Sequence, residues 1–348
     1  MQVDIIGGGI SGLSAAIALK KNNPQAEVIV HEKHGEIGNN LDARKCGEAH
    51  SIESFSLRFA PPPGSVASMI SEAETIVGRT TYRYQRTKDT AWILNRPVFI
   101  SYLGNTALDL GVILQKNDRI SDVAELSSDF IIDASGCPSP IRRKLHLPLR
   151  FVGVGYQETI SDCSVFEPGL MKIVFDKRGG YFWVFPRRSE FREVNVGVGF
   201  FKKQSLNLDQ VLSVFKKEYD ISGWVEHRTA GLIPFGVQYP LRKNNILFVG
   251  DAGVGTFPLD GQGIYRALMS GEAAGRHLAA SNPAGYVTEM LKMFIKWDLI
   301  GKLFLRSVYA TEKINKNGML HLWNVMQLLS NRFGLFESKF NMIQKSIS

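Results

Sequence analysis

The stretch VDIIGGGISG, residues 3–12, decides the fold. Its first half is an apolar run typical of a buried strand, and residues 12–21 have the composition of a helix. Asn-Asn-Pro at 22–24 ends this helix, and residues 27–31 read as a second strand. The N-terminus therefore predicts a βαβ unit. Its acidic residue and glycine cluster do not fit a signal peptide.

Three glycines lie where the first strand turns into the helix. Gly7, Gly9 and Gly12 have the spacing Gly-x-Gly-x-x-Gly. The first glycine permits a tight turn, the second lets the backbone approach a pyrophosphate, and the third lets the helix pack closely on the strand. Glu32 follows Gly12 by twenty residues, where a carboxylate can accept hydrogen bonds from an adenosine ribose. This order predicts a dinucleotide site rather than a turn that binds nothing.

A second glycine loop separates FAD from NAD as the expected dinucleotide. Residues 246–249 read as a buried strand that leads to Asp251, and FPLDGQG at 257–263 precedes another helix. Asp251 at a strand end can hold a ribityl hydroxyl, and Gly261 and Gly263 keep side chains away from a flat ring. The N–H groups at the start of the new helix would stabilise a reduced, anionic flavin. An NAD-binding fold has no use for this loop, so we expect FAD.

The stretch GYFWVFP, residues 180–186, is apolar on both faces of a strand. Tyr181, Trp183 and Phe185 share one face, and the residues between them point to the other. Such a strand is either buried in a core or lies between a core and an apolar cavity. Plain packing of aromatic side chains within a sheet is the simpler interpretation, whereas a flavin site nearby favours the cavity.

These motifs together resemble a known group of flavoproteins. GGGISG, Glu32-Lys33, Gly250-Asp251 and the loop with Pro258, Gly261 and Gly263 resemble the FAD-dependent oxidoreductases built like aromatic hydroxylases, and residues 133–143 resemble their internal Asp-Gly segment. Within that superfamily, RKCGE at 44–48 and YFWVFP at 181–186 resemble the two signatures of the geranylgeranyl reductases. The resemblance runs from Met1 to about Gly275.

The resemblance implies a FAD enzyme that saturates C=C bonds of geranylgeranyl or other isoprenoid lipid chains. It also implies an α/β fold: a FAD-binding Rossmann-like domain of the glutathione-reductase type, an inserted antiparallel β-sheet substrate domain and a helical C-terminus. Tyr181, Trp183 and Phe185 would form a wall of the lipid channel, and Cys46 would be the catalytic residue beside the flavin. By motif, the residues expected to bind FAD are Gly7, Gly9, Ser11, Gly12, Glu32, Lys33, Arg44, Cys46, Gly47, Arg96, Ile120, Asp251, Gly261, Gly263 and Ile264.

Several functional questions stay open at this point. Reduction of an isolated alkene needs a hydride from the flavin and a proton on the other carbon. Cys46 would gate the flavin, contact the substrate or hand on the proton; outside its motif it reads equally well as an ordinary buried cysteine. Electrons would come from NAD(P)H or a ferredoxin-like partner protein. The alternative functions are a FAD-dependent monooxygenase or halogenase, and a flavin-containing prenyl-lipid binding protein.

Strand and turn signals between residues 151 and 201 predict an antiparallel sheet inserted into the α/β frame. We expect a discontinuous FAD-binding domain of residues 1–77, 95–150 and 240–282, a substrate domain of 78–94 and 151–239, and a C-terminal helical region of 283–348. In that last region Met290, Phe294 and Trp297 share one helix face, with basic residues elsewhere. The helix either docks on an anionic membrane or covers the substrate domain.

Composition limits the remaining classes. The 41 Lys plus Arg against 33 Asp plus Glu give a net charge of +8, which favours an anionic partner such as a lipid head group or a phosphate. The basic residues are dispersed without a nucleic-acid motif. Three cysteines without close pairing, and no metal-ligand spacing, predict neither disulfide nor metal. No apolar run reaches the roughly 18 residues of a spanning helix. We therefore expect a cytoplasmic protein, or one peripheral on the inner membrane face.

Overall fold

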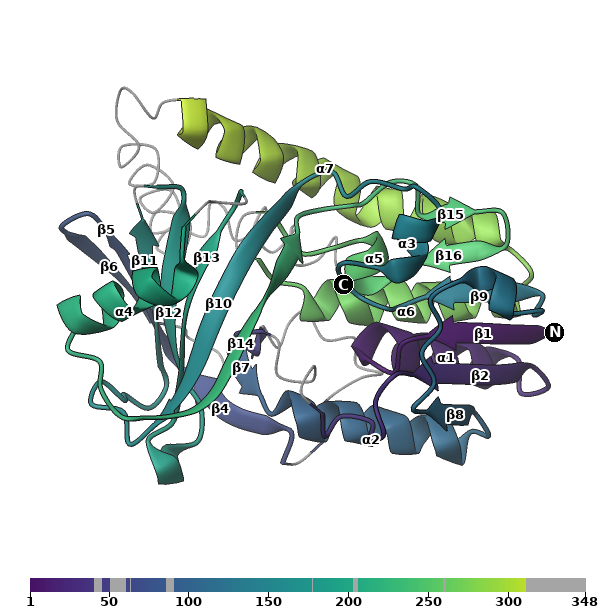
Figure 1. The fold of residues 1–348 in the computed structure, drawn as a ribbon, viewed down its shortest axis with the longest axis horizontal. Helices are drawn as coiled ribbons and strands as arrows, with labels where there is room; N and C mark the ends of the chain where they lie inside the picture. Colours follow the sequence, from purple (N-terminus) through teal and green to yellow (C-terminus); the bar gives the residue numbers. More distant parts are fainter. Residues whose placement is uncertain are drawn as a thin grey trace.

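The computed structural model describes residues 1–40, 46–50, 61–62, 64–85, 91–176, 178–202, 206–258 and 261–310. Figure 1 shows two layers of strands side by side: a Rossmann-like sheet covered by helices, and a large sheet that stands against it. The arrangement confirms the predicted architecture of an α/β domain that carries an inserted β-sheet domain, followed by a C-terminal helix.

The Rossmann-like sheet has six strands in the order β15-β16-β9-β1-β2-β8. Its strands are β1 (Gln2–Ile6), β2 (Glu27–Glu32), β8 (Ile113–Lys116), β9 (Phe130–Asp133), β15 (Arg242–Lys243) and β16 (Ile246–Phe248). All neighbours are parallel except the β15–β16 pair. The central strands are apolar because helices cover them on both sides. Their carboxyl ends share one edge, where ligands of such folds bind.

Three helices position that edge. They are α1 (Ile10–Asn22), α2 (Arg96–Asp109) and α6 (Ile264–Ala279). Helices α1 and α6 touch through glycine: a Cβ on Gly271 would lie 2.2 Å from the backbone oxygen of Ser11, and one on Gly275 would lie 2.3 Å from that of Ala15. This close packing puts the starts of both helices, and thus their free N–H groups, at the same edge of the sheet.

The second sheet has seven strands in the order β14-β10-β13-β12-β11-β5-β6. They are β5 (Glu72–Val77), β6 (Thr80–Gln85), β10 (Val152–Ser161), β11 (Leu170–Asp176), β12 (Gly180–Pro186), β13 (Val194–Phe200) and β14 (Trp224–Pro234). Helix α4 (Leu208–Glu218) packs on one face through Leu212 and Phe215. The predicted hairpin between β11 and β12 is confirmed. The sheet is not purely antiparallel, because β5 pairs with β11 in parallel.

The predicted boundary between residues 77 and 78 is wrong, because it cuts the β5–β6 hairpin. Both strands belong to the seven-stranded sheet. The segment 91–94, which the prediction also gave to that sheet, is β7 (Ala91–Leu94) and pairs instead with β3 (Ala49–His50) and β4 (Val66–Ile70). This small sheet joins the two large layers. Two short α-helices, α3 (Pro140–Lys144) and α5 (Gly250–Gly253), and two 3₁₀ helices, η4 (Val123–Glu125) and η5 (Ser189–Phe191), also belong to the described chain.

Helix α7 (Pro283–Ala310) packs on the Rossmann-like domain. Met290 and Phe294 are fully buried in its core and Trp297 lies against that core. Asp298 accepts a hydrogen bond from the Val237 backbone N–H at 2.7 Å and pairs with Arg266 of α6 at 2.8 Å. The apolar face singled out in the sequence is therefore not available to a membrane, and the helix covers this domain rather than the substrate domain. Within the described ranges, no helix has the length and apolar character needed to span a bilayer.

Candidate functional site

A cavity of about 870 Å³ lies between the two sheets, at the carboxyl ends of β1, β2 and β9. Apart from Gly12, which lies beneath it, every predicted site residue in the described chain lines this cavity. They are Gly7, Gly9, Ser11, Glu32, Lys33, Cys46, Gly47, Arg96, Ile120, Tyr181, Trp183, Phe185, Asp251, Gly261, Gly263 and Ile264. Arg44 lies outside the described residues. Residues predicted from separate motifs thus share one site.

The first glycine loop forms one end of the cavity. Gly7 has φ +109°, and a Cβ there would lie 2.6 Å from the Ala134 backbone oxygen. A Cβ on Gly12 would lie 2.0 Å from the Gly7 backbone oxygen, whereas one on Gly9 would meet nothing within 4 Å. Gly9 is also the N-cap of α1 and offers no side chain to its N–H groups. The loop therefore leaves open space beside an uncapped helix start, an arrangement that can accept a phosphate group.

Glu32 ends β2 beside this loop, with 7% of its surface exposed. Its carboxylate accepts hydrogen bonds from the backbone N–H groups of Gly8 at 2.8 Å and His34 at 2.9 Å. His31, which the sequence analysis did not select, also lines the cavity. Its ring nitrogens lie 2.9 Å from Asp4 Oδ1 and 2.7 Å from Asp118 Oδ2. No sequence signal could identify this histidine, because its partners come from β1 and from the segment after β8.

The second glycine loop forms the middle of the cavity. Burial raises the pKa of the Asp251 carboxyl, and the positive charges of Arg96 and Arg266 act in the opposite direction. Arg96 Nε is buried and has no hydrogen-bond partner among the described residues. The N-cap of α6 is Gly263, again without a capping side chain. Arg96 Nε and the uncapped start of α6 therefore lie at this part of the cavity without side-chain partners among the described residues.

Strand β12 forms the far wall and explains its two apolar faces. On one face, Phe182 stacks on Phe215 of α4 with ring centroids 4.1 Å apart, inside the core of the sheet domain. On the other face, Tyr181, Trp183 and Phe185 line the cavity, with centroids 5.8 Å apart for the first pair and 6.3 Å for the second. The strand therefore lies between a core and a cavity, as the second of the two sequence interpretations predicts.

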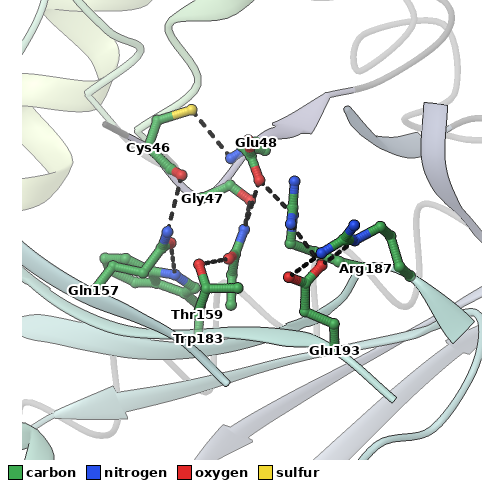
Figure 2. Close-up of polar contacts among 10 residues, drawn as sticks. Cys46, Gly47, Glu48, Gln157, Thr159, Trp183, Arg187 and Glu193 are labelled. Atoms are coloured by element: carbon green, nitrogen blue, oxygen red, sulfur yellow. Dashed lines mark hydrogen bonds and ion pairs between the residues drawn. The ribbon is translucent and has the colours of Figure 1, made fainter. Parts of the chain in front are cut away.

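The indole of Trp183 is seated on glycine. A Cβ on Gly197 of β13 would lie 2.1 Å from the indole ring, and one on Gly199 would lie 3.3 Å from it. Figure 2 shows how the ring is fixed from its side: Trp183 Nε1 donates to Gln157 Oε1 at 2.9 Å, and Gln157 Nε2 donates to the Cys46 backbone oxygen at 3.1 Å. The Cys-Gly-Glu turn and the aromatic strand are therefore connected through one glutamine.

A second contact brings these two motifs together. A Cβ on Gly47 would lie 3.0 Å from the Phe185 ring, so only glycine lets the turn pack on that ring without displacement. Burial raises the pKa of the Cys46 thiol, which lines the cavity, while Arg96 lowers it and Glu48 raises it. The two short motifs used for the family resemblance form one wall of the site.

Some lining residues carried no motif. Residues 229–233 of β14 and 155–157 of β10 complete the wall beside β12. Gly155 and Gly231 are cross-strand partners there. Paired small residues on neighbouring strands are the available sequence signal for an open face, but their pairing depends on a register that the sequence alone does not give.

Comparisons with known proteins agree with this geometry. Residues 5–57 match the family described as NAD(P)-binding Rossmann-like domain. A digeranylgeranylglycerophospholipid reductase from Methanocaldococcus jannaschii is 26% identical over 79% of this chain and 75% of its own length. One from Sulfolobus acidocaldarius is 24% identical over 82% of this chain and 70% of its own.

Solved structures show the same fold. A geranylgeranyl bacteriochlorophyll reductase-like protein from Thermoplasma acidophilum superimposes with a TM-score of 0.81 at 17% identity, covering 98% of both chains. A flavin-dependent brominase superimposes with a TM-score of 0.74 at 14% identity, covering 99% of this chain and 94% of its own. Along most of its length the chain is therefore similar to digeranylgeranylglycerophospholipid reductases, and it shares the fold of the geranylgeranyl bacteriochlorophyll reductase-like protein and of the flavin-dependent brominase.

Proposed function

We propose that the protein is a FAD-dependent reductase that saturates C=C bonds of geranylgeranyl or related isoprenoid lipid chains. The observation that carries the proposal is the single cavity, which runs from the first glycine loop to the aromatic face of β12. A dinucleotide and an apolar chain can meet in one space of this kind. The sequence relatives named as digeranylgeranylglycerophospholipid reductases support the substrate class.

The residues at the polar end fit FAD. Gly9 leaves room for a pyrophosphate at the uncapped start of α1, and Glu32 lies at the end of β2 for the ribose. Arg96 Nε is buried without a hydrogen-bond partner among the described residues, so a bound anion or carbonyl would satisfy it. Asp251 and the uncapped start of α6 would hold the ribityl chain and the ring.

The residues at the other end fit an apolar chain. Tyr181, Trp183 and Phe185 present aromatic surface, and Met171 and Ile173 of β11 extend it. An isolated alkene carries little charge, so its reduction depends mainly on holding the reacting carbons in position away from water. Reduced FAD, when bound, supplies the hydride for one carbon of the double bond. The wall would orient the chain against that end of the cavity.

We assign to Cys46, which lines the cavity, the proton that the second carbon needs. Because its thiol pKa is raised by burial, the sulfur stays protonated near neutral pH. We expect Cys46→Ala to retain FAD but to slow lipid reduction. The measurement is the rate of reduction per bound flavin, with flavin content determined separately by absorbance. Loss of FAD with unchanged turnover per bound flavin would contradict this role.

The decisive experiment is an anaerobic single turnover. The FAD-loaded protein is reduced with dithionite, mixed with a geranylgeranyl lipid, and followed by flavin absorbance and lipid mass spectrometry. We expect the flavin to reoxidise as the lipid gains two hydrogens per double bond. Repeating the assay with NADPH or with reduced ferredoxin in place of dithionite identifies the donor.

The same assay tests the alternatives. The fold is shared with a flavin-dependent brominase, so a monooxygenase or halogenase is the second candidate. Rapid reoxidation in air with a hydroxylated or halogenated product, and no hydrogen gain under anaerobic conditions, would select it. A flavin that resists dithionite while the protein binds lipid would instead select a prenyl-lipid binding protein.

A further inference from the structure

Glu48 carries one of the most deeply buried carboxylates that line the cavity, with 1% of its surface exposed. It belongs to the turn after Cys46, but its partners come from the sheet domain. Asn195 of β13 donates to Glu48 Oε2 at 3.0 Å, and Arg187, which follows β12, places its Nε 2.6 Å from the same oxygen. Figure 2 shows the Glu48 carboxylate directed at Arg187.

The charges around Glu48 compensate one another through ion pairs between protein side chains. The Arg187 guanidinium lies between two carboxylates, because Glu193 Oε2 accepts from its Nη1 at 2.6 Å. Glu193 is fully buried and is also bound by the partly exposed Arg188. If the Glu48 charge is removed, Arg187 therefore keeps a buried partner. A neutral residue at position 48 does not leave the Arg187 charge isolated in the interior, so we expect such a variant to fold.

The backbone at Glu48 is unusual. Its φ is +62°, in the left-handed region that residues other than glycine rarely adopt. Hydrogen bonds hold the turn on both sides: Gln157 donates to the Cys46 oxygen, Asn195 donates to the Gly47 oxygen at 3.3 Å, and the Glu48 oxygen accepts from the Leu94 N–H at 2.8 Å. Such a conformation persists where its surroundings determine it, and here the side chain itself is anchored.

The turn fixes the Cys46 sulfur. The Glu48 backbone N–H donates to Cys46 Sγ at 3.1 Å, so the position of the sulfur follows the conformation of Glu48. Among the described residues, the charged groups that act on the thiol are Arg96 from α2, which lowers its pKa, and Glu48, which raises it. Asp251 of α5 in turn faces Arg96.

We propose that Glu48 is a positioning residue for Cys46: held by Asn195 and Arg187 from the substrate sheet, its carboxylate fixes the left-handed turn that presents the thiol to the cavity. The inference deepens the proposed function, since it rests on Cys46 being the group beside the reacting carbons. The Glu48 side chain would thus connect the substrate sheet to the turn that carries Cys46.

The test measures the thiol directly. Full-length protein is alkylated with iodoacetamide across a pH series, with and without FAD, and the Cys46 peptide is quantified by mass spectrometry, which separates it from Cys137 and Cys163. The variants are Glu48→Gln, which keeps the shape and the Asn195 hydrogen bond, and Glu48→Ala, which keeps neither. Glu226→Gln is the matched control, because it removes a carboxylate of the same sheet that bonds to Ser161, far from the turn.

For Glu48→Gln we expect alkylation below the titration range of the thiol to be about threefold to tenfold faster than in the wild type, with an unchanged plateau at high pH. For Glu48→Ala we expect the plateau itself to change, since the turn is released. Should Glu48→Ala fail to fold, Glu48→Gly replaces it, because glycine adopts the left-handed conformation without the anchor. Profiles of Glu48→Gln and Glu48→Ala that coincide with those of the wild type and the control would overturn the proposal. So would a plateau changed equally in both variants.

A second readout ties the residue to the reaction. Lipid reduction per bound FAD should be slower in Glu48→Ala than in Glu48→Gln, with FAD affinity unchanged in both. If the wild type reduces no lipid, the proposed function fails, while the alkylation profiles still decide the role of Glu48.

Discussion

The seating of Trp183 on β13 gives the sharpest prediction about the cavity wall. Replacing Gly197 with alanine puts a methyl group 2.1 Å from the indole, where ordinary contact needs 3.4 Å or more. The neighbour is a rigid ring rather than the end of a flexible chain, so it must move by more than about 1 Å. That movement breaks the hydrogen bond from Trp183 Nε1 to Gln157.

The free energy of this change can be bounded. Overpacking of a well-packed site costs about 1–3 kcal/mol, and a lost hydrogen bond costs about 1 kcal/mol more. Replacing glycine by alanine lowers the conformational entropy of the unfolded chain, which stabilises the folded protein by about 0.4–1 kcal/mol. The Gly197→Ala protein should therefore be about 1–4 kcal/mol less stable than the wild type.

The assay is urea unfolding at one fixed FAD concentration, because bound ligand adds to stability. Trp183→Leu and the double variant complete a mutant cycle: without the indole, Gly197→Ala should be nearly neutral, which gives a coupling of about 1–3 kcal/mol. Gly231→Ala is the control, since a Cβ there meets nothing within 4 Å. Effects of Gly197→Ala and Trp183→Leu that simply add would refute the stacking of Trp183 on Gly197.

Two further predictions concern residues of the fold, Gly12 in the first glycine loop and the buried His50 of β3. Gly12→Ala should lower the yield of folded protein and abolish FAD binding, measured by circular dichroism and flavin fluorescence, because its Cβ would lie 2.0 Å from the Gly7 backbone oxygen; a stable, FAD-bound variant would contradict the helix position. Burial lowers the pKa of His50 to about 3 from 6.5. As pH falls, His50 of the unfolded chain therefore takes up a proton before His50 of the folded chain does. The contribution of neutral, buried His50 to the free energy of unfolding is complete above pH 6.5 and is lost as pH falls toward 3, at up to about 1.4 kcal/mol per pH unit. Urea unfolding of His50→Gln should show a shallower loss with acid than the wild type, and equal slopes would exclude His50 as the source.

Local sequence signals predict the glycine loops and the faces of β12 well. The helix after the first loop begins at Ile10 rather than Gly12. This shift is at the end of an element, where hydrogen bonds of the first turn decide the assignment. The sequence predicts the middle of a strand or helix better than its ends, because the alternating or helical spacing of apolar residues reflects burial directly.

Long-range pairing is what the sequence does not show. Strand β5 joins β11 in parallel across almost one hundred residues, and no local pattern specifies that register. The Glu48 group has the same origin: Arg187 follows β12 and Asn195 lies in β13, neither strand carries a charge motif, and only the fold brings the two residues to the turn. His31 likewise acquires its carboxylate partners from separate segments.

The central claim is that the cavity holds FAD with its pyrophosphate over Gly9. The backbone at Gly9 is extended, with φ −86° and ψ −173°, and a Cβ meets no atom within 4 Å, so valine fits the fold but fills the open space. The direct measurement is a fluorescence titration of the refolded, FAD-free wild type and Gly9→Val with FAD, alongside their thermal unfolding. We expect one FAD per wild-type chain, and in Gly9→Val an unchanged apo-protein stability with FAD binding weakened by about 100-fold or more. A wild type that binds no FAD, or a variant that binds it equally well, would contradict the account.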